Sequence, residues 1–64
     1  MSIGANIREK RVLLGMTQVE LAAMVGVKQS MIAQIERGTK TPSLPLGMQI
    51  AEALRCEIRE LTES

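Results

Sequence analysis

The sequence predicts a single all-α domain over residues 1–64, built as a compact bundle of about five short helices. Apolar residues recur at spacings of three and four along most of the chain, which is typical of helices with one buried face. Glycine, proline and residues that favour helix ends divide this pattern into short segments. The composition, 45% hydrophobic and 23% charged, is that of a globular chain rather than a disordered one.

The first expected helix covers residues 3–14 and ends at Gly15, since glycine readily adopts the left-handed conformation of a helix terminus. Ile3, Ile7 and Leu14 are separated by four and seven residues, so they share one face and are expected in the core. Three basic residues fall mostly on the other faces of this helix: Arg8, Lys10 and Arg11.

The second helix is expected to begin at Thr17, because the run TQVE is a capping box. In such a box the Thr17 hydroxyl accepts from the backbone N–H of Glu20, and the Glu20 side chain accepts from the backbone N–H of Thr17. Met16 and Leu21 flank the cap at the two positions of a hydrophobic staple. Gly26 ends the helix, whose apolar face comprises Leu21, Ala22 and Val25.

A third helix is expected over about residues 28–36, ended by Gly38 and followed by the turn TKTPS. Its apolar face comprises Met31, Ile32 and Ile35. A fourth helix begins at Ser43 or Leu44, with Pro45 tolerated in the first turn because no intrahelical donor is needed there. Its buried stripe comprises Leu46, Ile50, Ala53 and Leu54. A short fifth helix, at about 57–61, places Ile58 and Leu61 on one side.

The composition restricts the possible functions. Without aromatic residues the core must consist of Leu, Ile, Val, Ala and Met, and the five methionines either fill that core or form an adaptable contact surface. The single cysteine, Cys56, and the absence of histidine predict no disulfide and no metal site, and they favour a reducing, cytoplasmic location. We expect Cys56 to be at least half-buried. No catalytic set is evident, so the sequence predicts neither an enzyme nor a cofactor.

Membrane association is not expected. No apolar run approaches the roughly 20 residues that span a bilayer, and the first residues lack the apolar segment of a signal peptide. The net charge is only +1, but it is unevenly distributed. Residues 1–41 carry six basic and three acidic side chains, whereas residues 42–64 carry two basic and four acidic ones. The basic excess therefore lies in the part of the chain that contains the second and third helices, which is a mild indication of nucleic-acid binding.

Two short helices joined through a glycine turn, as in TQVELAAMVGVKQSMIAQIERG, form a helix-turn-helix unit. With this unit and the following TKTPSLPLGMQIAEAL, the sequence resembles the phage repressor and Cro-like (XRE-type) helix-turn-helix family over residues 3 to about 61. The resemblance rests on Thr17-Gln18, Leu21-Ala22, Val25-Gly26-Val27, Gln29-Ser30, Ile32, Ile35-Glu36-Arg37-Gly38, Pro42-Ser43-Leu44 and Ile50-Ala51-Glu52-Ala53-Leu54. It implies a lambda-repressor-like fold and a repressor-like transcriptional regulator that binds specific sequences in double-stranded DNA.

The resemblance also implies roles for individual residues. The third helix would enter the major groove and read bases through Lys28, Gln29, Ser30, Met31 and Gln34. Phosphates would be bound by Gln18, Arg37, Lys40, Arg11 and Lys10. Five of these assignments have plain structural alternatives. Lys28 could lie along the surface, Met31 could belong to the core, and Arg37 could cap its own helix. Gln29 and Ser30 could be ordinary solvated residues of the helix.

In this family an arginine near the end of the first helix commonly pairs with a glutamate at the end of the third. Arg11 and Glu36 match these positions, so the resemblance implies a structural ion pair that joins the two helices. Arg11 could then face a phosphate as well. Glu36 is accordingly expected to have a structural role rather than a catalytic one.

One subunit offers few phosphate contacts, so we expect a homodimer on a palindromic operator, with subunits about one helical turn of DNA apart. By family analogy the dimer surface would lie in the C-terminal region, Leu54 to Leu61, although Ile58 and Leu61 could equally close the core. The alternative function is a protein-interaction module of the same fold, which would use the methionines Met24, Met31 and Met48. No small-molecule ligand is expected.

Overall fold

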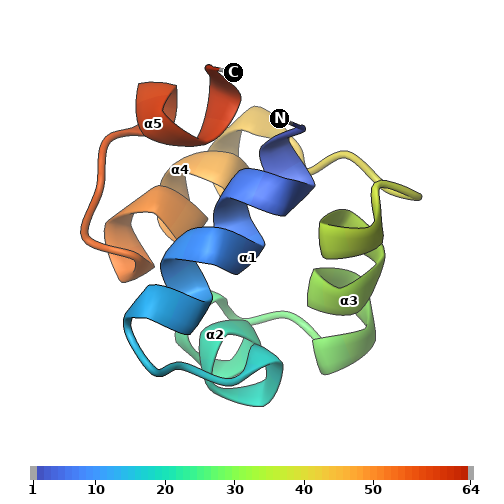
Figure 1. Ribbon diagram of the computed structural model, residues 1–64. Helices are drawn as coiled ribbons and strands as arrows, with labels where there is room; N and C mark the ends of the chain where they lie inside the picture. Colours follow the sequence, from blue (N-terminus) through green and yellow to red (C-terminus); the bar gives the residue numbers. More distant parts are fainter. Residues whose placement is uncertain (1, 64) are drawn as a thin grey trace.

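The computed structural model describes residues 2–63 and shows a bundle of five α-helices (Figure 1). The helices are α1 (Ile3–Leu13), α2 (Gln18–Val25), α3 (Gln29–Arg37), α4 (Leu44–Ala53) and α5 (Ile58–Thr62). Within residues 2–63 there is no strand, so the predicted all-α class is confirmed. None of the helices described is long and apolar enough to cross a membrane.

Helix α1 lies in the middle of the bundle and packs against α3 on one side and α5 on the other (Figure 1). Helix α2 packs against α3 and α4, and α4 also contacts α5. Every helix contributes to the centre of the core, where six side chains are fully buried: Ile7, Leu21, Ile32, Ile35, Ile50 and Leu61. The core is aliphatic, as the composition predicts.

The ends of the helices follow local sequence signals closely. The capping box is confirmed at α2: the Glu20 N–H donates to Thr17 Oγ1 at 3.0 Å, and the Thr17 N–H donates to Glu20 Oε1 at 2.8 Å. Gly26 ends α2 in the left-handed conformation, with φ of 72°. The expected bounds of the third helix are wrong by one residue. Lys28 precedes α3 in extended conformation, and the helix begins at Gln29 and extends to Arg37.

Two expected buried faces are corrected. Leu14 is 46% exposed rather than buried, because α1 ends at Leu13 and Leu14 is already its C-cap. Arg11, one turn beyond Ile7, faces inward in its place. In α4 the face turned to the core is Gly47, Ile50 and Ala51, continued by Leu54, whereas Leu46 and Ala53 are only partly buried.

Glycine at position 4 allows α1 and α3 to approach closely, a feature that the sequence pattern does not predict. A Cβ atom at Gly4 would overlap the carbonyl oxygen of Ile35. The opposite side of α1 is bound to α5 by Asn6, whose Nδ2 donates to the carbonyl oxygens of Leu61 at 2.8 Å and Glu63 at 3.0 Å. Helix α1 is therefore fixed to α3 and to α5 by different contacts.

Candidate nucleic-acid interface

The helices α2 and α3 are joined by a short turn that leaves the start of α3 exposed. After Gly26, the Val27 N–H donates to the Ala22 carbonyl at 3.0 Å, which closes the end of α2. Ala22 itself is 3% exposed. In α3, Ile32 and Ile35 are buried and hold the helix on the core. The first turn of α3 thus projects from the bundle.

The residues predicted to read bases occupy different environments on α3. Lys28, Gln29 and Ser30 are exposed at its N-terminal end. Gln34 is partly buried, and its backbone carbonyl accepts from the Thr39 N–H at 3.0 Å and the Thr39 hydroxyl at 3.1 Å. Met31 is partly buried and packs against the core. The structure therefore brings three of the five side chains to one exposed turn and gives Met31 a packing role.

Four side chains form a continuous set of hydrogen bonds across α1, α2 and α3, which we call the polar network: Arg11, Glu36, Gln18 and Gln29. Arg11 donates from Nε to Glu36 Oε2 at 2.7 Å and from Nη2 to Glu36 Oε1 at 3.0 Å. Gln18 Nε2 donates to Glu36 Oε1 at 3.1 Å, and Gln29 Nε2 donates to Gln18 Oε1 at 2.6 Å. The network runs from the buried ion pair to the exposed first turn of α3.

The buried end of the network is firmly ionised. Side chains of Arg11 and Glu36 are 11% and 2% exposed, and Arg11 Nη1 also donates to the Met16 carbonyl at 2.8 Å. Burial by itself would raise the pKa of Glu36. Hydrogen bonds from Arg11 and Gln18, with the positive charges of Arg11 and Arg8, outweigh burial and hold that pKa below its usual value. The hydrogen bond to Glu36 raises the pKa of Arg11 against the opposing effect of burial.

Three of the basic residues predicted to bind phosphate lie in two separate places. Arg37 and Lys40 are exposed at the end of α3 and in the turn that follows it. Lys10 lies on the other side of α1, with Nζ 3.5 Å from Glu60 Oε1 of α5. Its ammonium group thus lies beside α5 rather than α3, and Lys10 is outside the candidate interface.

Gln18 and Arg11 are placed differently from a simple phosphate clamp. The Gln18 side-chain amide is held inside the polar network, and the start of α2 presents the Gln18 backbone N–H. Arg11 donates to two neighbours within the protein. Sequence reasoning found the Arg11–Glu36 pair but missed the link through Gln18 to Gln29. Two glutamines at the first positions of consecutive helices were the available signal.

Comparisons with known proteins agree with this arrangement. Residues 7–61 match the model of a helix-turn-helix family. The chain belongs to this family. An uncharacterized HTH-type transcriptional regulator of Archaeoglobus fulgidus is 46% identical over 55 residues, which span 86% of this chain and 79% of the relative. A second such regulator, of Methanothermobacter thermautotrophicus, is 52% identical over 48 residues, spanning 75% of this chain and 70% of the relative.

Solved structures support the same assignment. The P22 c2 repressor, determined in complex with a synthetic operator, superposes with a TM-score of 0.93 at 32% identity, covering 98% of this chain and 96% of that one. The resemblance to repressor-like, XRE-type proteins is thereby confirmed, and this helix-turn-helix protein is a DNA-binding transcriptional regulator. Its family and fold are those of DNA-binding regulators rather than of enzymes.

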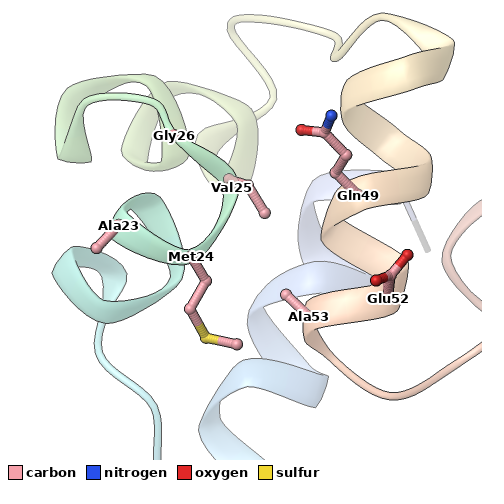
Figure 2. A pocket seen from close by; sticks show the side chains of 7 residues that line it. All are labelled: Ala23, Met24, Val25, Gly26, Gln49, Glu52 and Ala53. Carbon is pink, nitrogen blue, oxygen red and sulfur yellow. The ribbon is translucent and has the colours of Figure 1, made fainter.

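The helix-turn-helix protein also has a shallow groove between the end of α2 and α4. Figure 2 shows Met24 and Ala53 pointing toward one another across it, with Gln49 and Glu52 along the α4 side. Met24 is 58% exposed.

Proposed function

We propose that this protein is a repressor-like regulator that binds a palindromic operator as a homodimer, with α3 of each subunit in the major groove. We further propose that residues 1–64 act as one DNA-binding domain. The observation that carries the proposal is the exposed first turn of α3, where the Gln29 amide is held by Gln18 at 2.6 Å. A long polar side chain held in one position at the start of a projecting helix suits base recognition.

Gln29 is the proposed principal base reader. Its Nε2 gives one hydrogen to Gln18, and the second hydrogen and Oε1 remain for DNA. This donor and acceptor match the N7 acceptor and N6 donor of adenine in the major groove. Lys28 and Ser30 flank Gln29. Lys28 can contact guanine or a phosphate, and the Ser30 hydroxyl can contact a base edge or a phosphate. Gln34 and Met31 make at most minor base contacts in this proposal, because both are partly buried.

Phosphate contacts orient the helix. Arg37 and Lys40, exposed after the end of α3, are the proposed backbone clamps. The Gln18 N–H at the start of α2 adds a second anion-binding point, favoured by the positive end of that helix. Arg11 contributes by holding Glu36.

The dimer follows from the small number of these contacts, because two subunits double the cations that meet the DNA. The C-terminal region was expected to supply the contact, but Leu54 and Leu61 are 3% and 0% exposed and close the subunit's own core. The apolar surface that remains there is a groove between α4 and α5, lined by Met48 and Ile58. We propose this groove as the dimer contact.

The deciding experiment is selection of bound duplexes from a random pool with the wild-type protein and with Gln29→Ala. We expect a palindromic motif, relaxed at one base pair of each half-site in the variant, with a loss of about 1–3 kcal/mol for the selected base. Gln49→Ala, an exposed glutamine on α4, is the matched control and should retain the full motif. Recovery of no motif by the wild-type protein would overturn the proposal.

The alternative function, a protein-interaction module, draws support from the exposed Met24 and Met48. They lie in different grooves, Met24 between α2 and α4 and Met48 between α4 and α5, while Met31 packs against the core. Salt distinguishes the two functions. DNA binding through phosphates weakens steeply as salt is added, whereas apolar association does not.

A further inference from the structure

The polar network has a direction that is set by its buried end. Glu36 is ionised, and a carboxylate can only accept hydrogen bonds. Its Oε1 accepts from both Arg11 and Gln18, at 3.0 and 3.1 Å. With a side chain 2% exposed, Glu36 has little access to water that could substitute for these donors. Gln18 must therefore turn its NH₂ group, not its oxygen, toward Glu36.

The same reasoning continues outward. Once Gln18 donates through Nε2, the atom it offers to its other neighbour is Oε1, which is an acceptor only. Gln29 must then donate to Gln18, as it does at 2.6 Å. The order of donor and acceptor at the tip of Gln29 is thus determined by Glu36, which lies two hydrogen bonds away in the polar network.

We propose that Glu36 is a specificity-determining positioning residue: acting through Gln18, it fixes the orientation of the Gln29 amide and so selects the base that Gln29 reads. This inference rests on the proposed function, since it requires Gln29 to read a base. It adds to the structural role of the Arg11–Glu36 pair, in which Arg11 fixes the position of the carboxylate through two hydrogen bonds.

Amide orientation matters because the major-groove edge of each base pair presents donors and acceptors in a particular order. A Gln29 amide that is free to rotate by half a turn exchanges the positions of its oxygen and NH₂ group. In one orientation it matches the N7 acceptor and N6 donor of adenine, and in the other it opposes donor to donor and acceptor to acceptor. Fixing the orientation therefore excludes base pairs that a free glutamine would accept.

The test compares Gln29→Ala, Gln18→Met and Glu36→Gln. Each is measured on the selected operator and on duplexes with the other base pairs at the position that Gln29→Ala relaxes. Gln18→Met keeps the side-chain length and the Arg11–Glu36 pair but removes both amide bonds. Glu36→Gln keeps the shape and allows the amide of residue 18 to face either way. We expect each to lose about tenfold of base preference at that one position. Preference elsewhere in the motif should remain.

Glu36→Gln also weakens the ion pair and could fail to fold, so Gln18→Met decides the outcome. If Gln18→Met retains the wild-type preference where Gln29→Ala loses it, the inference is overturned while the proposed function stands. If Gln29→Ala relaxes no position, the reading role of Gln29 is overturned and the inference falls with it. In a Gln29→Ala background, Gln18→Met should cause no further loss of preference at that position.

A measurement without DNA completes the test. The two side-chain N–H resonances of Gln29 should be widely separated and slow to exchange with water in the wild-type protein, because one hydrogen is bound to Gln18. Both Gln18→Met and Glu36→Gln should shift them toward the values of a solvated glutamine such as Gln49. Unchanged Gln29 resonances in a folded Gln18→Met protein would contradict the hydrogen bond on which the inference depends.

Discussion

The two ends of α1 are joined to the rest of the bundle by buried polar side chains of different kinds. Asn6, 6% exposed, donates from Nδ2 to two backbone carbonyls at the end of α5. Arg11, with 9% of the whole residue exposed, donates to the Glu36 carboxylate of α3 and to the loop before α2. The first contact is neutral and ends at the backbone. The second is charged and continues through Gln18 to Gln29 on the exposed surface.

Under the proposed function, the first contact serves stability alone, whereas the second also serves base recognition. The hydrogen bonds of Asn6 end at backbone carbonyls and do not continue to other side chains. We therefore expect Asn6 to influence DNA binding only by keeping the domain folded. The Glu36 carboxylate has accepting positions beyond those that Arg11 occupies, and Gln18 uses one of them. Substitutions at the two ends of α1 should therefore have different effects on folding, on acid stability and on base preference.

The largest effect is expected for Arg11→Ala. It leaves the Glu36 carboxylate buried without its cation, which typically costs about 3–5 kcal/mol. That loss is comparable to the whole stability of a domain of this size, roughly 3–10 kcal/mol. Urea unfolding followed by circular dichroism measures it. The double variant Arg11→Met/Glu36→Met should recover much of the stability, since apolar replacement of a buried pair is often neutral. Equal instability of both variants would contradict this account.

A smaller loss is expected for Asn6→Ala, about 1–3 kcal/mol, because the Leu61 carbonyl loses its donor in a buried position. Asn6→Asp keeps the shape but sets an acceptor against two carbonyls, so it should be less stable than Asn6→Ala. At a temperature where Asn6→Ala is fully folded, its base preferences in the selection experiment should equal those of the wild type. A relaxed position in the motif would show that α5 influences recognition.

Acid should expose the charged contact selectively. The folded pKa of Glu36 lies below its unfolded value of about 4.3, so its contribution to stability is present above that pH and is lost as pH falls through the folded pKa. Urea midpoints measured from pH 7 down to pH 2.5 should decline below about pH 4 in the wild type.

The Arg11→Met/Glu36→Met protein is the control for this acid dependence. Its decline should be shallower. The remaining part would come from Glu20 and Glu60, whose pKa values are lowered by the backbone N–H groups of Thr17 and Glu57 that they cap. Identical profiles for the two proteins would show that the buried pair is not the acid-sensitive contact.

The smallest effect is expected at the exposed pair between Lys10 and Glu60. Its side chains are 27% and 46% exposed and its charged atoms are 3.5 Å apart, so Lys10→Ala should change the free energy of unfolding by less than about 1 kcal/mol. Operator affinity and its salt dependence should also be unchanged, because Lys10 faces α5. A reduced salt slope would instead restore Lys10 to the phosphate contacts.

The features that the sequence predicts correctly are those determined within a few residues. The capping box at Thr17 and the left-handed Gly26 depend on neighbours three or four positions away, and both are present. The expectation for Leu14 failed because helical spacing was extended one residue past the end of α1. The Arg11–Glu36 pair was found only through resemblance to a family, since no local pattern places residues 25 positions apart in contact.

The remainder depends on how whole helices cross. Gly4 lies against the Ile35 carbonyl of α3, a contact that depends on how α1 and α3 cross. From the sequence pattern alone, a glycine inside a helix is only expected to lower the stability of that helix. The bond from Gln29 to Gln18 likewise requires the specific angle between α2 and α3. The apolar character of Leu54 and Leu61 is compatible with either a dimer surface or a core, and only the packed structure shows that both are buried in the core.

If Gln29 reads a base as proposed, its hydrogen bond to Gln18 has a thermodynamic consequence for operator binding. A mobile surface side chain that becomes immobilised in a complex loses conformational entropy, at a cost of about 0.5–1.5 kcal/mol. Gln29 is already bound to Gln18 in the free protein, so most of its rotamers are excluded when the domain folds. Operator association then requires little further ordering at this position, and a protein with an apolar residue 18 would bind the same DNA with a less favourable entropy.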